Sequence, residues 1–127
     1  MTRIVLRWLL AIFFVLAGLN HFYMPAVYAG MLPAGLPWPA GLVAFSGACE
    51  ILGGIGVLVP PVRRAAGWGL IALLVAVFPA NLHAAMVGHI PGLGASPALL
   101  WLRLPFQAVF IAWVAWVAVA REPASSR

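Results

Sequence analysis

Four long apolar runs dominate the sequence, and six of the nine charged residues lie outside them. The runs cover approximately residues 4–20, 40–59, 65–85 and 98–120. A helix of about 20 apolar residues crosses the roughly 30 Å hydrocarbon core of a bilayer. Since 65 % of the 127 residues are hydrophobic and 7 % are charged, the chain cannot supply the polar surface of a soluble protein. The sequence therefore predicts an all-α membrane protein, a single transmembrane domain of four helices that lies in a lipid bilayer.

The arginines predict the orientation of this bundle. Nearly all of them fall at one end of the predicted helices, together with Glu122: Arg3, Arg7, Arg63, Arg64, Arg121 and Arg127. Arginine-rich ends stay on the cytoplasmic side. We therefore expect an integral protein, typical of the bacterial inner membrane, with both termini cytoplasmic. The net charge of +5 reflects this orientation and indicates no nucleic-acid partner, because no groove of basic and aromatic residues can be drawn.

The start of the chain has two readings. Arg3 and Arg7 before an apolar stretch resemble the layout of a secretory signal peptide. The run continues into aromatic residues rather than a soluble domain, which favours a first membrane helix.

The segment 22–39 that follows is rich in proline and interfacial aromatics and contains no charge. It predicts an interfacial lid between helices 1 and 2, with a short helix within residues 25–32 and no helix within residues 32–39.

Glu50 is a carboxylate in the middle of the second apolar run. At 100° per residue it shares one helix face with Ser46, Gly47, Gly53 and Gly54, so we expect this face to meet a neighbouring helix. An unpaired charge at the bilayer centre costs at least about 3 kcal/mol on insertion scales. We therefore expect Glu50 either to be protonated or to pair with Arg103, the other charged residue inside a span.

The predicted topology brings polar residues of all four helices to the middle or outer half of the membrane. As candidates for ligand binding or proton transfer we take His21, Ser46, Glu50, Asn81, His83, Arg103 and Gln107. The alternative is that these residues only hold the helices together, and His83 in particular fits a hydrogen-bonded packing role. Asn81 and His83 point some 160° apart on a regular helix, so they cannot both face one site unless the helix unwinds locally.

Metal binding and disulfide chemistry are weaker hypotheses. His21, His83 and Glu50 are acceptable ligand types, but they come from three helices without a paired spacing such as HExxH, so we expect no metal site. Cys49 is the single cysteine, which excludes an intrachain disulfide and a Cys-x-x-Cys motif. Nothing resembles the inverted repeats of many transporters.

Several short motifs occur together in an order that resembles the DoxX family of small four-helix membrane proteins. They are residues 17–22 (AGLNHF), the Pro-rich segment after them, Ser46-Gly47 with Glu50, Arg63-Arg64, residues 78–81 (FPAN), and residues 103–105 (RLP) with Gln107. The resemblance covers nearly the whole chain. It implies redox association for some members, such as the membrane subunit of a thiosulfate:quinone oxidoreductase, and receptor assembly for a vertebrate branch. A thiol relay is not implied, because this chain lacks a cysteine pair.

Two function classes stay open. In the first, the bundle binds a quinone or another small lipophilic ligand and acts as a subunit of a quinone-linked oxidoreductase. His21, Arg103 or Gln107 would then donate hydrogen bonds to carbonyl oxygens, and Glu50 or His83 would exchange protons. In the second, the chain is a non-enzymatic assembly factor or partner subunit. A redox enzyme, another membrane protein or a second copy of the chain remains open as partner.

Overall fold

The computed structural model describes residues 1–123, and most of them are helical. The segments are α1 (Thr2–Tyr23), α2 (Pro25–Met31), α3 (Pro39–Gly56), α4 (Arg63–Val87), α5 (Pro97–Val114) and the π-helical turn η1 (Ala115–Val119) that continues α5. Four helices are long and apolar enough to cross a membrane: α1, α3, α4, and α5 extended by η1. The predicted bundle of four transmembrane helices is confirmed.

Proline and glycine set several helix ends. Pro25, Pro39 and Pro97 each lie in the first turn of a helix, where the missing backbone N–H leaves no hydrogen bond unmade. Gly88 ends α4 in the left-handed conformation, with φ of +84°. α4 itself runs through Pro79 without ending. Proline therefore begins helices and glycine ends one here, whereas a proline inside a span does not by itself end the helix.

The turn between α3 and α4 begins earlier than the sequence predicts. α3 ends at Gly56 rather than at residue 59, and α4 begins at Arg63 rather than at residue 65. The Arg63 Nε donates a hydrogen bond to the Val57 carbonyl at 2.9 Å, which satisfies an oxygen that the end of α3 leaves free. Hydropathy alone extends the predicted helix to residue 59, because residues 57–59 are apolar and hydropathy contains no information on the Arg63–Val57 hydrogen bond.

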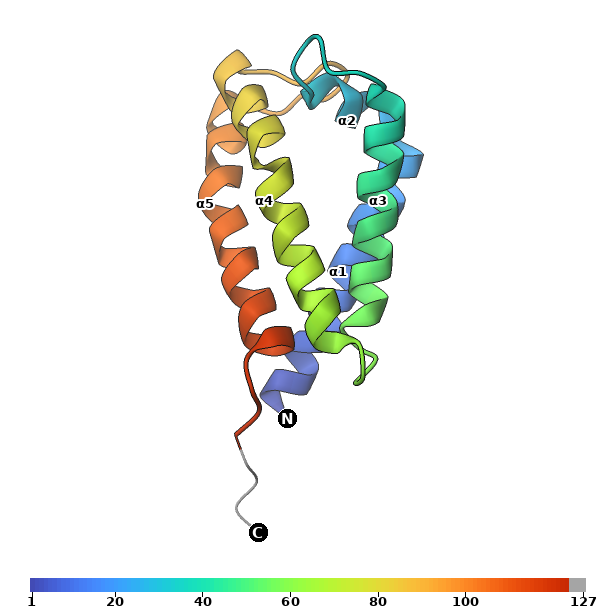
Figure 1. Ribbon diagram of the computed structural model, residues 1–127. Helices are drawn as coiled ribbons and strands as arrows, with labels where there is room; N and C mark the ends of the chain where they lie inside the picture. Colours follow the sequence, from blue (N-terminus) through green and yellow to red (C-terminus); the bar gives the residue numbers. More distant parts are fainter. Residues whose placement is uncertain (124–127) are drawn as a thin grey trace.

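The helices form two antiparallel pairs that meet along α3 and α4 (Figure 1). α1 packs against α3, and α4 packs against α5, while η1 contacts both α4 and α1. The amino terminus and the end of η1 lie at the same end of the bundle, which we call the termini end. The opposite end carries α2 and the connections 32–38 and 88–96, and we call it the lid end.

The predicted lid between helices 1 and 2 is present. α2 crosses the lid end and contacts α1, α3 and α4, and residues 32–38 after it are not helical. Trp38, the last residue of this connection, has the left-handed φ of 52°, unusual for a residue other than glycine. A small apolar core lies beneath the lid: Met31, Ala84, Ala85, Ile90 and Leu100.

The main core lies nearer the termini end, and large apolar side chains cover the outside. Core residues come from α1, α4, η1 and neighbouring segments: Leu10, Ala11, Phe14, Val57, Leu70, Val114, Val117 and Ala118. Trp8, Phe45, Leu52 and Trp68 are each more than half exposed on the surface of the bundle. A surface of this kind is stable in hydrocarbon and unstable in water. The chain is therefore an integral membrane protein.

Candidate functional site

Glycines allow α1 and α3 to approach each other closely. A Cβ atom on Gly18 would lie 2.6 Å from the Gly47 carbonyl oxygen and 2.7 Å from Cγ1 of Ile51. A Cβ on Gly54 would lie 3.0 Å from the Ala11 carbonyl oxygen. Small residues at such crossings let helix backbones touch in a membrane. The face of α3 that carries Glu50 therefore packs against α1.

His21 and Glu50 meet at this crossing. The His21 Nδ1 lies 3.5 Å from the Glu50 Oε2, and the two side chains are 10 % and 12 % exposed. The same nitrogen lies 2.9 Å from the Ala17 carbonyl oxygen, which can only accept, so Nδ1 carries a hydrogen and donates it there. The Glu50 Oε2 is buried and receives no hydrogen bond from any residue in 1–123.

This geometry restricts how protons are distributed over the pair. A lone charge inside the bundle is costly, so a neutral imidazole requires a protonated carboxyl group, and a protonated imidazole requires the carboxylate as its counter-ion. Both arrangements have the same net charge. Because Nδ1 already carries a hydrogen, the two arrangements differ in whether one further proton lies on the Glu50 carboxyl group or on Nε2 of His21, and neither leaves an unpaired charge.

The predicted Glu50–Arg103 ion pair is wrong. α3 packs on α1 and α4, so the carboxyl group meets a histidine of α1 instead of an arginine of α5. The Arg103 Nη1 lies 3.9 Å from the Met31 sulfur at the lid end. Helical periodicity identified the face on which Glu50 lies, but it does not specify which helix covers that face.

Residues of α1, α2 and α3 surround the pair on its lid side. The Tyr28 ring of α2 stacks on the His21 imidazole, with centroids 3.8 Å apart. The Asn20 Nδ2 donates to the Tyr28 hydroxyl at 2.8 Å, which holds that ring in place. Ser46 lies one turn before Glu50 on α3, and its buried hydroxyl has no hydrogen-bond partner among the described residues. Tyr28 is one of the aromatics of residues 22–39 that the sequence assigns to the membrane interface, and its stacking on His21 was not predicted.

A second polar group links α4 and α5. The Asn81 Nδ2 donates to the Gln107 Oε1 at 2.9 Å, and the Gln107 Nε2 donates to the Leu74 carbonyl. Gln107 is 5 % exposed. A glutamine that both donates and accepts between two helices satisfies its amide within the protein. This group serves to join the two helices of the pair.

The third polar group lies under the lid. The His83 Nδ1 lies 3.2 Å from the Met31 carbonyl oxygen, which places a ring of α4 against the end of α2. His83 and Asn81 thus contact different elements, as their angular separation predicts. The seven predicted residues do not converge on one site. They form three groups: His21 with Ser46 and Glu50, Asn81 with Gln107, and His83 with Arg103 around Met31.

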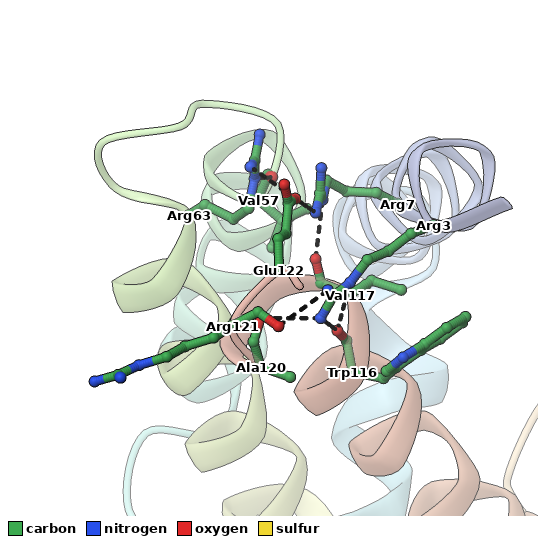
Figure 2. Close-up of polar contacts among 9 residues, drawn as sticks. All are labelled: Arg3, Arg7, Val57, Arg63, Trp116, Val117, Ala120, Arg121 and Glu122. Atoms are coloured by element: carbon green, nitrogen blue, oxygen red, sulfur yellow. Dashed lines mark hydrogen bonds and ion pairs between the residues drawn. The ribbon is translucent and has the colours of Figure 1, made fainter. Parts of the chain in front are cut away.

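Several arginines that the sequence places at the termini end form a cluster with Glu122, and the contacts within this cluster were not predicted from the sequence (Figure 2). The buried side chain of Arg7 donates from Nε to the Val117 carbonyl at 2.9 Å, and its Nη2 lies 2.8 Å from the Glu122 Oε1. The Arg63 Nη1 lies 3.8 Å from the same carboxylate oxygen. Arg3 and Arg7 are spaced i, i+4 and so share one helix face, which is the sequence feature that could have indicated the cluster.

The π-helical turn η1 presents its carbonyl groups to these arginines. The Ala120 N–H donates to the Ala115 carbonyl at 2.8 Å, which closes the wider turn. Arg3 donates to the carbonyls of Trp116, Ala120 and Arg121. Cationic side chains stabilise the carboxyl end of a helix because its last carbonyls have no helical partner. The amino end of α1 therefore caps the last transmembrane helix.

Glu122→Gln is expected to change the acid sensitivity of the protein. The hydrogen bond from Arg7, together with the nearby arginine charges, holds the pKa of the Glu122 carboxyl below its ordinary value of 4.5. A lowered pKa stabilises the folded state above pH about 4.5, and this contribution is lost as the pH falls through the lowered value. The melting temperature of the wild type in detergent should therefore fall more steeply below pH about 4.5 than that of the variant. Parallel melting curves across this range would contradict the assignment.

The described residues contain no group of three or more histidine, cysteine, aspartate or glutamate side chains placed to hold a metal ion. The polar side chains within the spans contact one another in pairs or contact backbone carbonyls. The chemistry available at the His21–Glu50 pair is hydrogen bonding and proton exchange.

Comparison with known proteins identifies a family. Residues 10–118 match the model of a family described as Domain of unknown function (DUF8561). No curated protein and no solved structure matches the chain. The matched residues include α3, α4, most of α1 and of α5 with η1, and the His21–Glu50 pair, whereas Arg3, Arg7 and Glu122 lie outside them. Because the match covers well over half of the sequence, the chain belongs to the DUF8561 family.

Proposed function

We propose that this chain is a DoxX-like membrane subunit that binds a quinone or another small lipophilic ligand beside His21 and Glu50. The observation that carries the proposal is a buried histidine–carboxyl pair within membrane-spanning helices whose Glu50 Oε2 receives no hydrogen bond from residues 1–123. Glu50 lies 11 residues after the start of α3, about 16 Å along the helix and near mid-membrane. Ionisable residues at this depth mark ligand or proton pathways more often than surface residues do.

The residues around the pair fit a ligand that carries oxygen atoms. The Ser46 hydroxyl and the Glu50 Oε2 are buried polar atoms without partners in the described chain, so a ligand hydroxyl or carbonyl could satisfy them. His21 is held in orientation by the Ala17 carbonyl and the Tyr28 ring. A bound quinone would supply two-electron redox chemistry, with electrons delivered by a partner redox enzyme. Glu50 would exchange a proton with the ligand oxygen, and a protonated His21 would act as the counter-ion of the resulting carboxylate.

The cellular orientation belongs to the same proposal. The arginines that flank the spans gather at the termini end (Figure 2), which supports a cytoplasmic position for that end in a bacterial inner membrane. In this orientation the His21–Glu50 pair would lie within the membrane, away from the cytoplasmic termini end. A ligand would reach the pair from the bilayer, which is where a quinone partitions.

Quinone binding is testable with purified protein in detergent and decylubiquinone as the probe. We expect saturable binding by calorimetry in the wild type and a loss of about tenfold or more in affinity, worth about 1.4 kcal/mol, in Glu50→Gln and His21→Gln. Glu122→Gln is the matched control. It makes the same substitution in the second glutamate of the chain, which lies at the termini end, away from the His21–Glu50 pair. Absence of saturable binding, or equal affinity in Glu50→Gln, would contradict the proposal.

The alternative function is that of a non-enzymatic assembly factor or partner subunit. It is favoured by the Asn81–Gln107 and His83–Met31 contacts, which satisfy polar groups between helices without a ligand. Gly69 on α4 has no neighbouring atom within 4 Å of an added Cβ, so this small-residue surface is open to a partner helix or a second copy. In this case Glu50→Gln would lower thermal stability without altering any ligand response, and a membrane protein would co-purify with the wild type.

A further inference from the structure

Arg103 forms no salt bridge with an acidic group among residues 1–123. The sequence contains two acidic side chains, Glu50 and Glu122. Glu50 lies against His21, and Glu122 lies against Arg7 at the termini end of the bundle. The polar contact that Arg103 makes within residues 1–123 is a weak one, to the Met31 sulfur at 3.9 Å. No counter-ion for Arg103 is therefore present among the described residues.

The depth of Arg103 indicates where such a counter-ion is found. Arg103 lies six residues after the start of α5, about 9 Å along the helix from the lid end. A long arginine side chain at this depth can extend along the helix and bring its guanidinium to the level of lipid headgroups. Arg103 is exposed on the outside of the bundle, although its Nη1 also lies 3.9 Å from the Met31 sulfur. Phosphate groups of the adjacent leaflet are thus within its reach.

An apolar groove of about 310 Å³ accompanies Arg103 on the lipid-facing side. Leu93 and Ala95 of the 88–96 connection form one wall of it. Leu99, Leu102 and Phe106 of α5 form the other, at spacings that place them on one helix face. The groove has an apolar lining with one cationic side chain beside it. This arrangement is complementary to a lipid with an acyl chain and an anionic headgroup.

We propose that Arg103 binds the phosphate of an anionic phospholipid of the leaflet at the lid end, and that an acyl chain of this lipid lies in the groove. A guanidinium binds a phosphodiester through two parallel hydrogen bonds, which a sulfur contact cannot replace. The headgroup carries the negative charge that the chain lacks at this end. This site is separate from the His21–Glu50 pair and does not depend on quinone binding.

The test uses delipidated full-length protein and native mass spectrometry with phosphatidylglycerol or phosphatidylcholine as the probe. We expect one tightly retained phosphatidylglycerol per chain, with retention of phosphatidylcholine weaker by about tenfold. Arg103→Gln should lose this preference, and Arg103→Lys should keep part of it because the charge remains. Arg64→Gln is the matched control, since Arg64 is exposed at the termini end and makes no polar side-chain contact within the described chain.

A second variant tests the groove independently of the charge. Ala95→Trp fills the groove from the connection side and leaves Arg103 in place, so phosphatidylglycerol retention should fall about tenfold. Glycerophosphoglycerol, the headgroup without acyl chains, should fail to compete. Equal retention by wild type and Arg103→Gln, or full competition by the free headgroup, would overturn the proposal. A lipid-free homodimer that Arg103→Gln dissociates would also overturn it, because the counter-ion would then be protein.

Discussion

Gly18→Ala is expected to separate α1 from α3 and to destabilise the protein by about 1–3 kcal/mol, the usual cost of overpacking a close contact. The new Cβ would lie 2.6 Å from the Gly47 carbonyl oxygen and 3.0 Å from the Ile51 backbone nitrogen. Backbone atoms cannot move aside as a flexible side chain can, so one helix must shift as a whole. A shift at this crossing also lengthens the contact between His21 and Glu50. Thermal unfolding of purified protein in detergent measures the loss.

Gly69→Ala provides the matched control. Gly69 is also a helical glycine in a span, but nothing lies within 4 Å of the Cβ position. Alanine has the higher helix propensity by about 0.8–1.0 kcal/mol, so this variant should melt at or above the wild-type temperature. If Gly18→Ala and Gly69→Ala have the same melting temperature, the close approach of α1 and α3 at Gly18 does not stabilise the packing of these two helices.

The sequence predicts the fold well because apolar length and proline positions are local properties. The four runs became α1, α3, α4 and α5 with η1, and the Pro-rich segment became α2 with its non-helical connection. The ends are less accurate because they depend on contacts between segments. Arg63, for example, caps the Val57 carbonyl and begins α4 two residues early.

The candidate site was less predictable, because sequence periodicity assigns a residue to a face and not to a neighbour. Glu50 was expected to face another helix, and it does, but the partner is His21 rather than Arg103. The choice between α1 and α5 depends on the glycines that bring α1 against α3. The opposed directions of Asn81 and His83 were predicted correctly because both lie on a single helix.

Arg7 shows the limit of assigning charges from hydropathy. Its place near the start of the first run indicates a residue at a helix end, in contact with water or headgroups. In the structure it is 6 % exposed and reaches across to the end of η1 (Figure 2). No spacing within the first run could indicate this contact, since its partners lie 110 and 115 residues away in sequence.

Arg7→Gln is expected to be among the most destabilising single substitutions at the termini end. The variant removes the Nε donor from the Val117 carbonyl and the Nη2 donor from Glu122. Loss of a buried hydrogen bond that involves a charged group costs about 1.5–3 kcal/mol, and glutamine is too short to replace the contact at this distance. The melting temperature should fall well below that of the wild type, and α1 should exchange amide hydrogens faster near its amino end.

Two further variants separate the contact with Val117 from the contact with Glu122. Glu122→Gln keeps the Val117 hydrogen bond, and because the Glu122 side chain is 61 % exposed it should lower the melting temperature much less than Arg7→Gln. Arg64→Gln removes an exposed arginine at the same end and should have no effect. If Glu122→Gln and Arg7→Gln have equal effects, the ion pair rather than the cap on η1 joins α1 to the last helix. If all three variants have the melting temperature of the wild type, the arginine cluster does not hold α1 against the last helix.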